Sequence, residues 1–78
     1  MSRQRDRREA RALAYLQRHY RASALDIGAA AVAGEGRSGK ISSHGKESIG
    51  LSIAIALARR GVVEATRENS FKIVRSAQ

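Results

Sequence analysis

The chain has 78 residues, which is enough for one small domain and leaves no room for a second hydrophobic core. Fifteen Lys and Arg residues stand against seven Asp and Glu residues, and the resulting formal charge of +8 favours a polyanionic partner. Cysteine is absent, which excludes disulfides and thiolate metal sites, and the two isolated histidines lack the spacing of a metal pair. We therefore expect neither a metal nor a cofactor.

The N-terminal segment is mostly charged, and residues 1–7 are expected to form a flexible basic arm. A single domain is expected to span residues 8–78. From about Arg8 the alanine-rich sequence predicts a helix, because alanine has the highest helix propensity. The residues expected on one face of this helix are Leu13, Leu16 and Tyr20.

A second helix is predicted to begin at Ser23, a favoured N-cap residue, with Asp26 three positions later as in a capping box. Gly28 lies inside this helix and costs about 1 kcal/mol relative to alanine. The residues expected on the inward face are Leu25, Ala29 and Val32.

The segment Gly34 to Gly45 is rich in Gly and Ser and predicts a loop that is long for so small a domain. Its glycines and Lys40 match the start of a phosphate-binding P-loop, but Ile41 stands where the pattern requires Ser or Thr to hold magnesium. The chain is also too short for the parallel sheet that a P-loop needs. We therefore predict no nucleotide hydrolysis and, more generally, no enzymatic activity.

The segment from Lys46 to Arg75 carries the strongest structural signal in the chain. It predicts a third helix from Glu47 to Arg60, capped by Ser43 or His44, with Gly61 as a left-handed C′ residue. The run Val62-Val63-Glu64-Ala65-Thr66 is typical of a strand, and turn-forming residues separate it from the alternating run at 71–75. They predict a two-stranded antiparallel hairpin.

The order of these elements resembles the winged helix family of DNA-binding domains. The match rests on the segments Leu25 to Ile27, Ile49 to Leu57 and Arg59-Arg60-Gly61-Val62-Val63. The resemblance implies an α+β fold with three helices followed by a C-terminal two-stranded β-hairpin. It also implies a small transcriptional or architectural factor that binds double-stranded DNA, with the third helix in the major groove and the wing on phosphates or in the minor groove.

Two features depart from that family. The long loop replaces a tight turn between the second and third helices, and the third helix has few side chains that read bases. Leu51 and Ile55 fall opposite the apolar face of this helix. Since a helix that is apolar all round is usually buried all round, we expect the loop or a second subunit to cover them.

Binding is therefore predicted to depend on phosphate contacts, with weak sequence preference. The candidate nucleic-acid-binding residues are Arg3, Arg5, Arg7, Arg37, Lys40, Ser43, His44, Lys46, Ser48, Arg67 and Lys72. One alternative is a protein-interaction or homodimerisation module that uses Leu51 and Ile55, and another is association with RNA or the ribosome. The longest uncharged run, Ser48 to Ala58, is too short to cross a bilayer, and the charged N-terminus is unlike a signal peptide. We expect a soluble cytoplasmic protein with no membrane partner.

Overall fold

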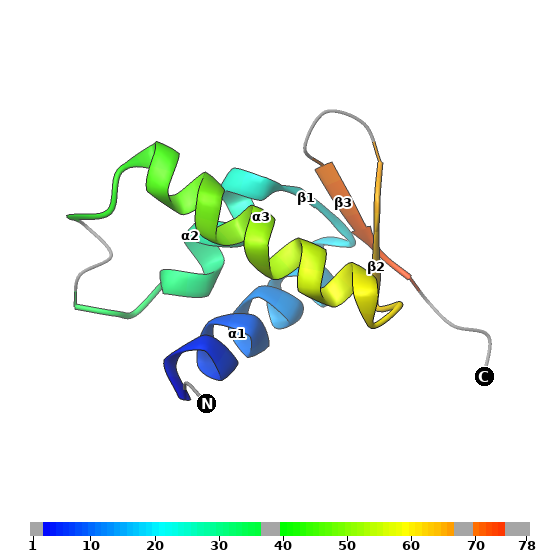
Figure 1. Ribbon diagram of the computed structural model, residues 1–78, viewed down its shortest axis with the longest axis horizontal. Helices are drawn as coiled ribbons and strands as arrows, with labels where there is room; N and C mark the ends of the chain where they lie inside the picture. The colour runs from blue at the N-terminus through cyan, green and yellow to red at the C-terminus, as the bar shows by residue number, and fades with distance from the viewer. Residues whose placement is uncertain (1–2, 37–39, 67–69, 75–78) are drawn as a thin grey trace.

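The computed structural model describes residues 3–36, 40–66 and 70–74 of the chain (Figure 1). Three helices pack together, and three short strands form a sheet on one side of them. In chain order the elements are α1 (Arg3–His19), β1 (Arg21–Ser23), α2 (Ala24–Val32), α3 (Ser43–Arg59), β2 (Val63–Ala65) and β3 (Ser70–Ile73).

The predicted fold class is wrong in its sheet. The hairpin of β2 and β3 is present, with Val63 opposite Ile73, but β1 also pairs with β3, with Ala22 opposite Phe71. The sheet therefore has three antiparallel strands in the order β1-β3-β2, and its strands are split between the helices. Three residues are too few to show an alternating pattern, and β1 forms because β3 supplies its hydrogen-bonding partners.

Helix α1 begins at Arg3, before the predicted start near Arg8, and so includes part of the segment predicted as an arm. Its buried residues are Ala12 and Leu16. The helix ends at His19, and Tyr20, the next residue, has a left-handed φ of 69° that redirects the chain into β1. The Tyr20 carbonyl then accepts a hydrogen bond from Ile73 N–H at 2.9 Å, which ties the end of α1 to β3.

Helix α2 has the predicted cap, because the Ser23 hydroxyl accepts a hydrogen bond from Asp26 N–H at 3.2 Å. Its predicted inward face is only partly correct: Val32 is buried, but Leu25 is 38% exposed. The side that faces α3 and the core instead consists of Ala24, Ile27, Gly28, Ala31 and Val32.

Helix α3 begins at Ser43 rather than Glu47, and its N-cap is Ser42, whose hydroxyl accepts from Gly45 N–H at 3.1 Å. Glycine and serine at these positions have low helix propensity, so the sequence predicted a loop there, and packing overrides that preference. At the other end the prediction for Gly61 is confirmed, since its φ is 76°.

Two glycines let α2 and α3 cross with their backbones in contact. A Cβ atom on Gly28 would lie 1.6 Å from the Lys46 carbonyl oxygen, and one on Gly50 would lie 1.8 Å from the Ala24 carbonyl oxygen. No side chain fits at either position unless the helices move apart. The surrounding core includes Leu16, Ile27, Leu57 and Phe71, so separating the helices would also open that core.

We predict that Gly28→Ala and Gly50→Ala each lower the free energy of unfolding by about 1–3 kcal/mol or prevent folding, because the added methyl overpacks the crossing. At an ordinary helix position the same change would raise stability by about 0.5–1 kcal/mol. Urea unfolding followed by circular dichroism measures the difference. Gly36→Ala is the control, since a Cβ there meets no atom within 4 Å. Stabilisation by Gly50→Ala would contradict the close crossing.

Candidate nucleic-acid interface

The outer face of α3 is uncovered along its length in the part of the chain that the structure describes. The inner face is buried through Gly50, Ile53, Ala54 and Leu57. At 100° per residue, the opposite side carries residues spaced three or four apart, and all of them are exposed. From the N-terminal end these residues are His44, Ser48, Leu51, Ser52, Ile55 and Arg59.

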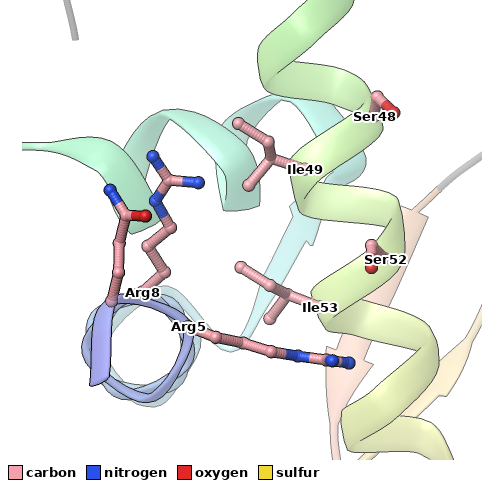
Figure 2. Close-up of a pocket in the computed structure, with 7 residues that line it drawn as sticks. Arg5, Arg8, Ser48, Ile49, Ser52 and Ile53 are labelled. Atoms are coloured by element: carbon pink, nitrogen blue, oxygen red, sulfur yellow. The ribbon is translucent and has the colours of Figure 1, made fainter. Parts of the chain in front are cut away.

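A cleft of about 400 Å³ lies between this helix and α1 (Figure 2). Figure 2 shows Ile49 and Ile53 pointing from α3 into the space between the helices, while Arg5 extends from α1 beneath Ile53. The side chains that line the cleft are Gln4, Arg5, Arg8, Ser48, Ile49, Ser52 and Ile53. The cleft floor is therefore apolar, and its rim carries guanidinium and hydroxyl groups.

A second cleft of about 390 Å³ adjoins the first and shares Arg5, Ser48 and Ser52 with it. Its remaining lining residues are Leu51, Ile55, Ala56 and Arg59. None of the residues that line the two clefts is acidic. We call this continuous surface, formed by Arg5, Ser48, Leu51, Ser52, Ile55 and Arg59, the α3 face.

Partly buried ion pairs hold α1 against the ends of the other two helices. The Arg8 guanidinium donates two hydrogen bonds to the Glu35 carboxylate, at 3.1 and 2.9 Å. Arg11 donates a third to the same carboxylate at 2.7 Å, and its Nε donates to the Ala31 carbonyl at 2.9 Å. Because Glu35 follows α2, these bonds fasten α1 to the end of α2. An Arg60–Glu9 ion pair joins α1 to the end of α3 in the same way.

The cluster also changes the acidity of its carboxyl group. The hydrogen bond from Arg8, followed by that from Arg11, lowers the pKa of Glu35 to about 2 from an ordinary 4.5. Glu35 keeps a side-chain exposure of 17%, so water still reaches it. Its negative charge is held against α1 and the segment after α2, and it does not line either of the two clefts of the α3 face.

The predicted contact residues are brought together only in part. Ser48 and Arg5 lie on the α3 face, and Lys40, Ser43 and His44 are exposed at the N-terminal end of α3. Lys46 is half-buried and lies on the inner side of the helix, where its carbonyl oxygen meets Gly28.

The other predicted residues lie away from this face. Arg7 lines a hollow between α1 and the segment after α2, and Arg3 is exposed near the start of α1. Lys72 lies on β3, where its ammonium is 3.0 Å from the Glu64 carboxylate. Arg37 and Arg67 lie outside the described residues.

The expectation that the long loop covers Leu51 and Ile55 is wrong, since these side chains are 37% and 44% exposed. The described part of that loop, including Gly34, Gly36 and Ile41, instead lines a hollow with the arginines of α1. Arg59 was missed as a candidate site residue. Its position one turn after Ile55 was the available signal, because it places the guanidinium on the same face.

Comparisons of the chain with protein-family models, with curated proteins and with solved structures found no match. Within the described ranges, no helix combines the length and apolarity needed to cross a bilayer. The same residues contain no group of three or more His, Asp or Glu side chains that could hold a metal ion. The α3 face is therefore the feature of this protein that most directly indicates a function.

We predict that Glu35 stabilises the fold in a pH-dependent manner. Because its pKa is lowered on folding, the contribution is complete above the unfolded pKa of about 4.5 and is lost as the pH falls towards about 2. Urea unfolding of wild type and Glu35→Gln across this range should show a stability gap that closes on acidification. Arg8→Gln removes the main partner of Glu35. In that background, Glu35→Gln should lower the free energy of unfolding by less than it does in wild type at pH values above about 4.5. A gap that stays constant down to pH 2 would contradict the assignment.

Proposed function

We propose that the protein binds double-stranded DNA through the α3 face, as a small cytoplasmic transcriptional or architectural factor without catalysis. The observation that carries the proposal is the pair of adjoining clefts that contain arginines and serine hydroxyls but no carboxylate. A surface of this kind attracts phosphate, and the chain's charge of +8 adds a long-range attraction to polyanions.

The shape of α3 supports the same proposal. The helix has 17 residues, and at 1.5 Å per residue it is about 25 Å long. The major groove of B-DNA is wide enough to admit an α-helix of this kind. Lys40 and His44 are exposed at the N-terminal end, which is the end that contacts base edges in helix-turn-helix proteins.

The hairpin of β2 and β3 is a second proposed contact, in keeping with the resemblance to winged helix domains. We expect Lys72 to contribute little to the affinity, because its charge is partly compensated by Glu64. The proposed binding is therefore centred on α3, with phosphate contacts dominating its affinity.

We predict that Arg5→Gln and Arg59→Gln each weaken binding to a short mixed-sequence duplex. Each should also reduce the slope of log K against log salt concentration by about 1, as expected for the loss of one phosphate contact. Fluorescence anisotropy at several salt concentrations measures both effects. Arg18→Gln is a matched control with the same charge change, because Arg18 lines a different hollow beside Asp26.

Two results would end this proposal. One is the absence of binding to any duplex at low salt. The other is an Arg18→Gln variant that is affected as strongly as the two variants of the α3 face. Competition between duplex DNA and structured RNA distinguishes the proposed partner from RNA or the ribosome, since the same charge also suits an A-form backbone.

A protein interface is a second candidate, favoured by the exposure of Leu51 and Ile55. A two-fold homodimer through this face would bring the arginines of both copies into one interface, and the clefts of neither copy are lined by a carboxylate that could pair with them. The face therefore suits an acidic protein partner better than a second copy.

We predict that sedimentation velocity detects a monomer, and that the double variant Leu51→Glu/Ile55→Glu sediments like wild type. This follows from the like charges of Arg5 and Arg59 at the borders of the apolar pair. A wild-type dimer that the double variant dissociates would contradict the prediction and favour the homodimer.

A further inference from the structure

We propose that Leu51 and Ile55 recognise thymine by contacting its C5-methyl group in the major groove. The inference rests on the proposed binding of duplex DNA by the α3 face. It adds a base preference to an interface otherwise expected to be dominated by phosphate contacts.

The first argument is the position of the two side chains. Leu51 and Ile55 lie one helical turn apart in the middle of the α3 face, at 37% and 44% exposure. Four residues of α-helix advance about 6 Å, which is close to two base steps of about 3.4 Å each. With α3 lying along the groove, the two side chains reach base pairs about two steps apart.

The second argument is the chemistry of the neighbouring side chains. Between Ser48 and Ala58 the helix carries no Arg, Lys, Asn or Gln, which are the side chains that make bidentate bonds to guanine or adenine. Ser48 and Ser52 offer hydroxyls, which both donate and accept and so discriminate bases weakly. Thymine is the base that presents a methyl group in this groove, and apolar side chains are the groups that contact it.

The third argument is charge. Arg5 and Arg59 border the apolar pair and line the same cleft, which contains no carboxylate. Phosphates border the major groove on both sides, so an apolar centre with cationic flanks matches the groove better than it matches an uncharged apolar protein surface. The charge pattern therefore favours DNA over an uncharged apolar protein surface as the occupant of this face.

The test compares an alternating A–T duplex with the same duplex in which deoxyuridine replaces every thymidine. This change removes the methyl group and keeps the hydrogen-bonding edges. We expect wild type to bind the thymine duplex more tightly, by about fourfold for each contacted methyl group. Leu51→Ala and Ile55→Ala should each remove part of this preference without changing the salt slope, because neither contacts phosphate.

Leu25→Ala is the matched control, since Leu25 is similarly exposed, at 38%, but lies on α2. It should keep the full preference for thymine, and circular dichroism should show that all three variants are folded. Equal affinity of wild type for the two duplexes would overturn the thymine inference while leaving DNA binding intact. Failure to bind either duplex would instead overturn the proposed function.

Discussion

The contact of the α2 and α3 backbones at Gly28 and Gly50 is the constraint on which the rest of the structure depends. Each glycine faces a carbonyl oxygen of the opposite helix, at Lys46 and Ala24, with no space for a side chain. This proximity brings Ile27 and Leu57 into one core. It also fixes which side of α3 is used for packing, and so leaves the opposite side to the solvent. A wider crossing would change both the core and the surface proposed for binding.

The second requirement of the proposed interface is the placement of α1. Glu35 binds two arginines of α1, Arg8 and Arg11, and Glu9 binds Arg60 at the other end. Together with the Glu64–Lys72 pair on the sheet, these pairs hold three of the chain's seven acidic side chains, Glu9, Glu35 and Glu64, in paired form outside the lining of the two clefts. The net positive charge of the chain is therefore distributed unevenly over its surface. The residues that line the clefts beside α3 include arginines and no acidic residue, and this local composition matters more for binding phosphate than the total charge does.

Local signals predicted the local features well. The Ser23 cap, the left-handed Gly61 and the pairing of the last two strands follow from side-chain chemistry within a few residues, and each is confirmed. Features that depend on contacts between residues distant in the sequence could not be predicted from such local patterns. Strand β1 exists because β3 lies beside it, and Gly28 was interpreted as a cost when it is the point of helix contact. In the candidate site, helical periodicity could place Ser48, Leu51, Ile55 and Arg59 on one face. The position of Arg5 beside α3 could not be predicted, because it depends on how α1 packs against α3.

The central place of β3 in the sheet has a consequence for biosynthesis. Strand β1 follows the first helix, yet its partner is among the last described residues, with Arg21 opposite Lys72. During translation the helices can form and begin to pack while β1 still lacks any strand to pair with. The sheet closes only after the ribosome has released the segment around Phe71, whose side chain completes the core. The sheet can therefore form only once β3 has been synthesised, and a chain truncated before β3 would leave β1 and β2 without the strand that both of them pair with.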